Sequence, residues 1–238
     1  MNILNEIAEK TKERIEAEKK AFDYPFEKAL KTNDIAFICE LKKASPSKGI
    51  ICEDFDYIQI AKDYEAAGAA AVSVLTEPFY FQGHDKYLRE IAQAVSIPLL
   101  RKDFTVDEYM IYETKVLGAS AVLLICAILD DETLKRYIEI AHSIGLSALV
   151  ETHDEREVET ALKAGARIIG VNNRNLKTFE VDITLSERLK KLVPNDIIFV
   201  AESGIKTRED VAKMREIGAD AVLVGEALMK GASLQSLR

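Results

Sequence analysis

Short runs of apolar, β-branched residues recur along the chain and alternate with longer charged segments. Eight such runs have the length and composition of buried strands. They cover residues 35–41, 70–76, 97–103, 121–126, 147–152, 168–172, 198–203 and 221–226. Segments of helical period lie between many of them, at residues 57–67, 107–117, 131–143, 154–163, 185–192 and 208–217. Each helix is long enough to return the chain for a parallel pairing of the flanking strands.

A glycine ends several of these predicted helices. Gly68, Gly118, Gly165 and Gly218 each precede an alanine and then a strand, and Gly145 does the same without the alanine. Glycine accepts the left-handed conformation that closes a helix. Strands that are apolar along most of their length indicate a parallel sheet covered on its faces, so eight strand–helix units predict a closed β/α (TIM) barrel. The alternative is an open doubly wound sheet, but no Gly-x-Gly-x-x-Gly follows the first strand.

The first 34 residues do not fit the repeat. They are a highly charged segment of helical period, interrupted by Pro25 and followed by a short second helical segment. The sequence therefore predicts an N-terminal helical extension over residues 1–34 and one barrel domain over residues 35–238.

Composition narrows the class of protein. The 238 residues are 48% apolar and 30% charged, which suits one globular domain, and the net charge of −8 disfavours nucleic acid and anionic membranes as partners. The longest apolar run, residues 121–129, is too short to cross a bilayer, and the start lacks the layout of a signal peptide. We expect a cytoplasmic protein.

Neither cysteine nor histidine spacing predicts a metal centre. Cys39, Cys52 and Cys126 form no Cys-x-x-Cys pair, so neither a disulfide framework nor a zinc site is indicated. The only histidines are His84, His142 and His153. They lack the spacing of metal ligands, so we expect no metal.

Polar residues stand where several strands end, which is where catalytic residues of such barrels lie. In the first strand Ile38, Glu40 and Lys42 share one side, and Cys39 points the other way. The other polar residues at strand ends are Lys102, Glu151, Asn172, Arg174, Glu202 and Ser203. Any one of them could simply begin a solvated loop. Gathered together, they would be costly to desolvate unless they paired with one another or with a ligand, which favours a polar site.

The last two strand ends favour phosphate. Ser203-Gly204 and Gly225-Glu226 follow the seventh and eighth predicted strands, where barrels often bind phosphate. Glycine lets an oxyanion approach backbone N–H groups. Either glycine alone could merely make a turn, but the two together point to a phosphate site.

One family resembles these motifs closely, the indole-3-glycerol phosphate synthases. The similar segments are Glu40-Leu41-Lys42-Lys43-Ala44-Ser45-Pro46-Ser47-Lys48-Gly49, Leu75-Thr76-Glu77, Tyr80-Phe81-Gln82-Gly83, Leu100-Arg101-Lys102-Asp103-Phe104, Val150-Glu151, Gly170-Val171-Asn172-Asn173-Arg174-Asn175-Leu176, Ala201-Glu202-Ser203-Gly204-Ile205 and Val224-Gly225-Glu226. The resemblance implies a cofactor-free lyase of tryptophan biosynthesis. Its substrate would be 1-(2-carboxyphenylamino)-1-deoxyribulose 5-phosphate, and other enzymes of that pathway would be candidate partners. It also implies that the N-terminal extension packs across the barrel mouth.

The resemblance assigns roles to individual residues. Lys102 would be the general acid of ring closure, and Lys42, tuned by Glu40, would hold the substrate carboxylate. Glu151 would serve the later proton transfers; the division among Glu40, Lys42 and Glu151 stays open. The expected remaining catalytic, substrate-binding and phosphate-binding residues are Asn172, Ser203, Ser45, Phe81, Phe104, Leu124, Arg174, Glu202, Gly204, Gly225 and Glu226. Glu226 is unusual beside a phosphate, so we expect its side chain to turn away.

Three alternatives remain from the residues alone. A sugar-phosphate isomerase would share the phosphate site, although one acting on phosphoribosylanthranilate should carry a cysteine where Glu40 stands. A Schiff-base aldolase would use Lys102 as its nucleophile. A non-catalytic barrel would only bind a phosphorylated ligand, and the retention of both lysines and the strand-end glutamates disfavours it.

Overall fold

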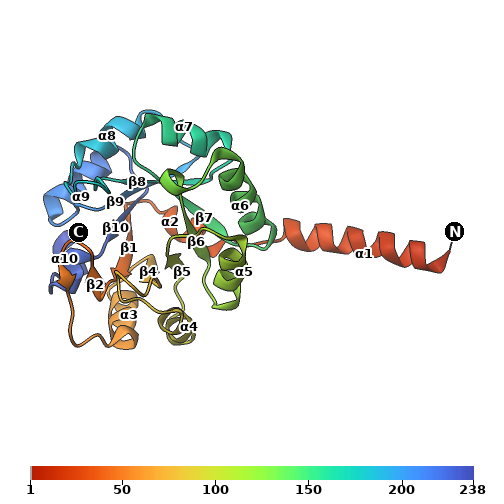
Figure 1. The fold of residues 1–238 in the computed structure, drawn as a ribbon, viewed down its shortest axis with the longest axis horizontal. Coiled ribbons are helices and arrows are strands. Elements are labelled where there is room, and N and C mark those ends of the chain that lie inside the picture. The colour runs from red at the N-terminus through yellow and green to blue at the C-terminus, as the bar shows by residue number, and fades with distance from the viewer. Residues whose placement is uncertain (1) are drawn as a thin grey trace.

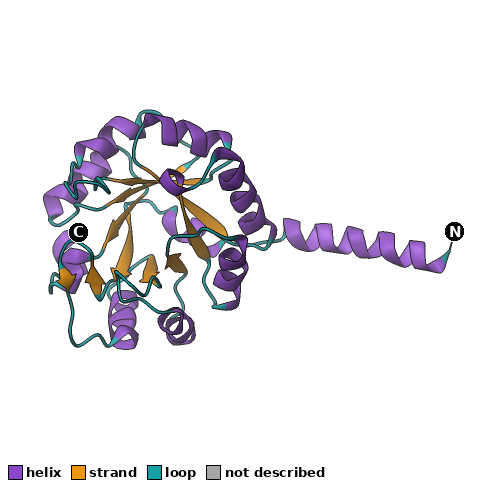
Figure 2. Ribbon diagram, in the orientation of Figure 1, coloured by secondary structure: helices purple, strands orange, loops and turns teal. Residues whose placement is uncertain are grey.

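The predicted barrel is confirmed by the computed structural model, which describes residues 2–238 (Figures 1 and 2). Eight parallel strands close in the order β1-β10-β9-β8-β7-β6-β5-β4. Their bounds are β1 Ala36–Leu41, β4 Ala71–Leu75, β5 Leu99–Lys102, β6 Ala121–Ile125, β7 Ser147–Thr152, β8 Ile168–Asn172, β9 Ile198–Glu202 and β10 Ala221–Val224. A two-stranded hairpin, β2 Ala44–Ser45 with β3 Gly49–Ile50, follows β1. Each strand lies within the run predicted for it, or matches it.

Helices cover the outside of the barrel. The main ones are α3 Tyr57–Ala66, α4 Asp85–Ala94, α5 Glu108–Val116, α6 Asp131–Ser143, α7 Glu155–Lys163, α8 Thr184–Lys190 and α9 Arg208–Glu216. Asp56, Asp107, Asp130 and Asp154 cap four of them by accepting a hydrogen bond from a backbone N–H of the first turn. Three short elements complete the barrel: the 3-10 helix η1 Cys126–Ile128, α10 Glu226–Met229 and α11 Leu234–Leu237. Within residues 2–238, no helix has the length and apolarity that a bilayer crossing needs.

Alternation along each strand divides its side chains between two cores. Ile38 of β1 belongs to the cluster inside the barrel, whereas Cys39 belongs to the larger cluster between strands and helices. The same parity places Leu100, Leu149 and Val200 inside. Because the side-chain period is two, the residues two positions later face inward at the mouth.

The bottom of the barrel is closed by α2, which spans Pro25–Leu30. Phe26 and Leu30 are fully buried and pack with inward residues such as Ala36 and Ala71 at the amino ends of the strands. Glu27 of the same helix accepts from the Ser147 hydroxyl. Pro25 stands in the first turn, where its missing N–H costs nothing, so the helix begins at this proline.

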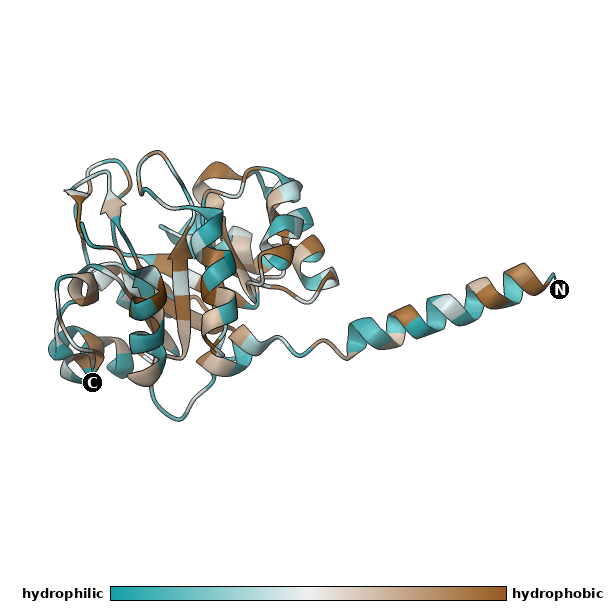
Figure 3. Cartoon of the chain, turned by 90° about the horizontal axis from the view of Figure 1, so that it is seen from below, coloured by the Kyte–Doolittle hydropathy of each residue, from teal (hydrophilic) through white to brown (hydrophobic). Residues whose placement is uncertain are grey.

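Helix α1, Ile3–Lys20, projects away from the barrel (Figures 1 and 3). None of its residues is buried, and Ile3, Leu4 and Ile7 are 54 to 67% exposed. In this structure α2, rather than α1, is the part of the extension that packs on the barrel, and the packing of residues 1–34 across the mouth stays a prediction. The most apolar part of the extension, Phe26 and Leu30, fits the apolar bottom instead, and the charged α1 makes no apolar contact with the barrel.

Candidate active site

Charged and polar side chains from six strand ends converge on one pocket at the mouth of the barrel. The pocket is lined by every predicted site residue except Leu124, together with residues that include Pro46, Ser47, Asp103, Leu123, Ile125 and Leu223. Glu40, Glu151 and Glu202 are each at most 3% exposed. Three buried carboxylates in one place need cations close by, because an isolated buried charge is costly.

Two lysines supply those cations. Lys42 Nζ lies 2.6 Å from Glu40 Oε1. Lys102 Nζ donates to Glu151 Oε2 at 3.0 Å and lies 3.3 Å from Glu202 Oε2. The parity predicted for β1 is confirmed, since Glu40 and Lys42 line the pocket and Cys39 faces the helices.

The carboxylates keep Lys102 protonated. Burial lowers the pKa of an ammonium, but the charges of Glu151, Glu202 and Glu40 outweigh burial and raise the pKa of Lys102 above its ordinary value. An ammonium can donate a proton or a hydrogen bond to a reacting oxygen. It cannot attack a carbonyl, so this arrangement suits a general acid better than a Schiff-base nucleophile.

Glu151 and Glu202 differ although both contact Lys102. Burial raises the pKa of Glu151, but Lys102, His153 and the Asn172 amide, which donates at 3.1 Å, together lower it below the ordinary value. Glu202 has fewer partners: burial and the charges of Glu151 and Glu40 raise its pKa to about 7. Within the described residues its Oε1 finds no hydrogen-bond donor. Glu151 is thus held ionised, whereas the pKa of Glu202 lies near neutral pH. Two carboxylates with pKa values pushed apart in this way are typical of acid–base sites.

Two glycines make room for these carboxylates. A Cβ at Gly170 would lie 2.2 Å from Glu202 Oε1, and a Cβ at Gly225 would lie 2.8 Å from Glu40 Oε1. Both distances are below any real Cβ contact, so a larger residue would displace the carboxylate. Gly170 was not among the predicted site residues, and only its place inside the strand, two residues before Asn172, could have signalled a close approach.

An apolar wall forms one side of the pocket. The rings of Phe81 and Phe104 lie 6.2 Å apart and tilted by 38°. Glu77 fixes the loop that carries Phe81, because its carboxylate accepts from the backbone N–H groups of Phe79, Tyr80 and Phe81.

Leu124 does not belong to this wall. It is fully buried in the outer core between strands and helices, and its neighbours Leu123 and Ile125 line the pocket instead. The prediction missed the parity of β6, whose inward residues are Ala121, Leu123 and Ile125.

The opposite side carries the glycine turn predicted for phosphate. Ser203 and Gly204 both have positive φ, at 63° and 82°. A Cβ at Gly204 would meet Val181 at 2.5 Å, so the turn requires glycine on both counts. Gly225 and Glu226 stand beside it on the lining of the same pocket.

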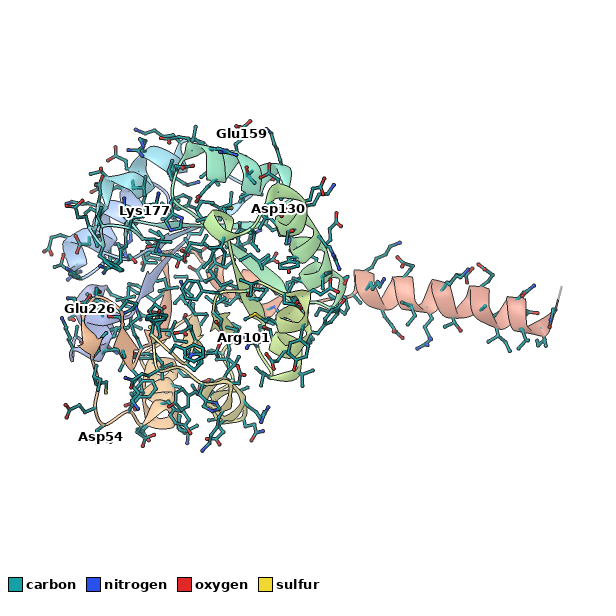
Figure 4. All side chains as sticks on the ribbon, viewed as in Figure 1. Asp54, Arg101, Asp130, Glu159, Lys177 and Glu226 are labelled. Atoms are coloured by element: carbon teal, nitrogen blue, oxygen red, sulfur yellow. The ribbon has the colours of Figure 1, made fainter. Side chains whose placement is uncertain are left out.

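The Glu226 side chain pairs with lysines. It bonds Lys48 of the loop after β1 and contacts Lys230 at 2.8 Å. Burial raises its pKa, but these two lysines outweigh burial and lower the pKa of Glu226 to about 2. Glu226 is the first residue of α10, and Figure 4 shows it at the outer edge of the barrel.

Arg101, the neighbour of Lys102 in β5, pairs with carboxylates on the outer side of the strand. Its side chain is buried, donates to Asp85 and Glu113 at 2.8 Å each and to Thr76 at 3.1 Å, and lies beside α5 in Figure 4. Arg101 and Lys102 are adjacent in β5 and therefore face opposite sides.

Among residues 2–238, no three His, Cys, Asp or Glu side chains converge as ligands of a metal ion would.

Comparisons with known proteins agree with this geometry. The family described as "Indole-3-glycerol phosphate synthase" matches residues 2–237. The indole-3-glycerol phosphate synthase of Ruminiclostridium cellulolyticum is 58% identical over 99% of this chain and 98% of its own length. The one of Caldanaerobacter subterraneus subsp. tengcongensis is 51% identical over 96% of this chain and 93% of its own.

Solved structures with low sequence identity share the fold alone. The N-acetylmannosamine-6-phosphate 2-epimerase from Clostridium perfringens has a TM-score of 0.63 and 18% identity, over 82% of this chain and 86% of that chain. The tryptophan synthase complex of Pyrococcus furiosus has a TM-score of 0.62 and 16% identity, over 83% and 89%. The family is shown by the sequence matches, which cover nearly the whole chain. The chain belongs to the indole-3-glycerol phosphate synthase family.

Proposed function

We propose that the chain converts 1-(2-carboxyphenylamino)-1-deoxyribulose 5-phosphate to indole-3-glycerol phosphate, carbon dioxide and water, as its family membership indicates. The observation that carries the proposal is the buried ammonium of Lys102, held by two glutamates between an aromatic wall and a glycine turn. Such a pocket matches a substrate that has an anilino ring at one end and a phosphate at the other.

Lys102 acts as the general acid of ring closure. The anilino ring attacks the substrate ketone, and negative charge develops on the ketone oxygen. The ammonium of Lys102 donates its proton to that oxygen, which becomes the hydroxyl that later leaves as water. A raised pKa guarantees that the proton is present at neutral pH.

Lys42 holds the substrate carboxylate until it leaves as carbon dioxide. Glu40, 2.6 Å away, orients the ammonium and offsets its charge when the carboxylate has gone. Ser45 lies on the same lining and positions the substrate from the loop after β1.

Glu151 serves the proton transfers that follow decarboxylation. Being ionised, it accepts the proton that must leave the ring carbon for the indole to become aromatic, and it passes that proton to the hydroxyl, which leaves as water. Asn172 keeps the carboxylate oriented, and Glu202, with its pKa near 7, takes part in positioning the hydroxylated part of the substrate.

The phosphate lies against the turn after β9 and the start of α10. Backbone N–H groups at Ser203, Gly204, Gly225 and Glu226 donate to it, and Arg174 adds a positive charge from the loop after β8. Phe81 and Phe104 hold the anilino ring, with Leu123 and Ile125 in the place expected for Leu124.

We further propose that α1 covers the mouth when substrate is bound. Its exposed Ile3, Leu4, Ile7 and Ile15 form an apolar stripe that has no partner within residues 2–238, and the mouth exposes Phe79, Phe104 and Phe179. Deleting residues 2–21 should raise KM several-fold while the unfolding temperature stays within a few degrees. Unchanged KM would remove this role.

The cytoplasm and a phosphorylated small molecule complete the proposal. The three cysteines are free, which suits a reducing compartment. Enzymes of the same pathway are the partners we would test first.

The product itself provides the test. The chain contains no tryptophan, so indole emission in a reaction mixture comes from the product alone. Purified protein mixed with the anilino-sugar phosphate should develop indole fluorescence at a rate proportional to enzyme concentration. A folded sample that binds phosphate and develops none would contradict the proposal.

A further inference from the structure

His153 lies directly behind Glu151, on the side away from Lys102. Its Nε2 is 3.3 Å from Glu151 Oε1, and its Nδ1 is 3.0 Å from Glu157 Oε2. The backbone N–H of His153 also donates to Glu157 Oε2 at 2.7 Å. The imidazole lies between two carboxylates, with Nδ1 bonded to Glu157 and Nε2 within ion-pair distance of Glu151 but, among the described residues, without a hydrogen bond. Glu151 is therefore flanked by two cationic groups, Lys102 on one oxygen and His153 on the other.

The imidazole is charged in this setting. Burial lowers the pKa of His153, but its contacts with Glu151 and Glu157 outweigh burial and raise the pKa to about 10. The titratable and charged groups that face His153 or line its cavity come from β7, the turn before α7, α7, the loop after β8 and α8. They are Glu151, Asp154, Glu157, Arg174, Lys177, Glu180, Asp182 and Arg188.

A second cavity reaches His153 from outside the substrate pocket. His153, Asp154 and Glu157 line it, whereas Lys102 and Glu151 line only the substrate pocket. A substrate in the mouth therefore leaves the far side of His153 open, and His153 itself does not line the substrate pocket.

The reaction creates a need for this second cation. When Lys102 gives its proton to the ketone oxygen, the buried carboxylates of Glu151 and Glu202 lose the ammonium that neutralised them. The stronger the hold of Glu151 on that proton, the higher the barrier to its transfer. A cation behind Glu151 weakens that hold and keeps Glu151 ionised after the transfer.

We propose that His153 is a positioning residue that holds Glu151 in place and, as a cation, neutralises it from behind while Lys102 donates its proton. The inference rests on the proposed function of the pocket, and it adds a residue that the family motifs quoted above do not include.

The test compares His153→Gln and His153→Ala with the parent enzyme by indole fluorescence. Gln can still contact Glu151 but carries no charge. We expect kcat to fall roughly tenfold to a hundredfold in both variants, as for other residues that orient a reacting group from behind, with KM within about twofold. The acid limb of the kcat–pH profile should move upward by about one unit, because removing a nearby cation raises the pKa of Glu151.

His142→Gln is the matched control. His142 is the other partly buried histidine, lies in α6 and contacts Tyr24 near the bottom of the barrel. It should leave kcat and the pH profile unchanged. Added imidazole, which can enter the second cavity, should restore part of kcat to His153→Ala and none to His153→Gln, whose side chain occupies the space.

The outcomes separate the two proposals. A parent enzyme that forms no indole overturns the proposed function. An active parent with His153 variants of unchanged kcat, or of lower kcat with an unmoved acid limb, overturns only the role of His153. Should His153→Ala fail to fold, His153→Gln and its pH profile decide alone.

Discussion

The two ends of the barrel interior are built from the same alternating positions and filled with opposite chemistry. At the bottom, Ala36 and Ala71 pack against Phe26 and Leu30 of α2 and form a dry core. At the mouth, the interior holds Glu40, four positions beyond Ala36 in β1, and other charged side chains. The backbone geometry is shared, so the difference lies only in which residues occupy the inward positions.

This contrast separates stability from chemistry. Apolar residues at the bottom stabilise the folded state by leaving water, whereas buried charges at the mouth destabilise it unless each has a partner. Glu202, whose Oε1 has no donor within the described residues, is a place where that cost is not fully offset. Substitutions at the bottom should therefore change folding, and substitutions at the mouth should change turnover.

Removing Lys102 should give the largest effect. In Lys102→Ala, kcat should fall by about 10²- to 10⁴-fold or more, because general acid catalysis contributes about that much. Substrate binding should remain measurable, since the wall and the glycine turn are untouched. Indole fluorescence gives kcat, and equilibrium titration gives Kd.

Lys163→Ala is the control for this prediction. Lys163 pairs with Glu159 on α7, and its side chain is 73% exposed. It should behave as the parent does. Near-normal turnover in Lys102→Ala would mean that another group donates the proton.

Removing a buried side chain at the bottom of the barrel should lower stability and leave turnover unchanged. Phe26→Ala should lower the free energy of unfolding by about 3 to 5 kcal/mol, because a fully buried ring leaves a cavity, with kcat nearly unchanged well below the unfolding temperature. Denaturant unfolding measures the first and indole formation the second. Val116→Ala, at a residue 82% exposed, should cost far less. A large loss of kcat in folded Phe26→Ala would break the separation between the two ends.

Glu202 should make the free energy of unfolding depend on pH, because its burial at the mouth is not fully offset. Its pKa is raised to about 7 in the folded chain, above the ordinary 4.5, so the folded state binds the extra proton between these values. Stability from this group is then complete below pH 4.5 and is lost as pH rises toward 7. Glu202→Gln should remove that loss and be more stable than the parent above pH 7, by a few kcal/mol at most, since one pKa unit is about 1.4 kcal/mol.

Glu139→Gln serves as the control for the pH series, because Glu139 is exposed on α6. Its unfolding free energy should follow the parent at every pH. A parallel loss of stability with pH in Glu202→Gln would assign the effect to another group.

Much of this arrangement could be predicted from the sequence because it follows from period and parity. The eight strand runs needed only apolar length, and the inward direction of Glu40 and Lys42 followed from Ile38 two residues before. Leu124 shows how fragile that reasoning is. A run that is apolar throughout, as in β6, carries no polar residue to fix which face is which.

Other features depend on contacts between segments that are distant in the sequence, and no pattern within one segment names its partner. The room that Gly170 gives Glu202 involves two neighbouring strands, and the place of His153 behind Glu151 depends on the turn between β7 and α7. The location of α2 under the barrel could not be read from its length or charge, because a short apolar helix could cover either end.

A substitution at the rim of the mouth, where Glu226 lies, should give the smallest effect. Glu226 turns its carboxylate to Lys48 and Lys230, as the phosphate proposed beside it would require. Glu226→Gln removes a negative charge near the bound phosphate and frees Lys48 to approach it. We expect KM to fall about two- to fivefold at low salt, with kcat unchanged, and the difference to shrink as salt screens the charges. A higher KM at every salt concentration would instead show that the pair with Glu226 holds Lys48 and its loop in the shape that binds phosphate.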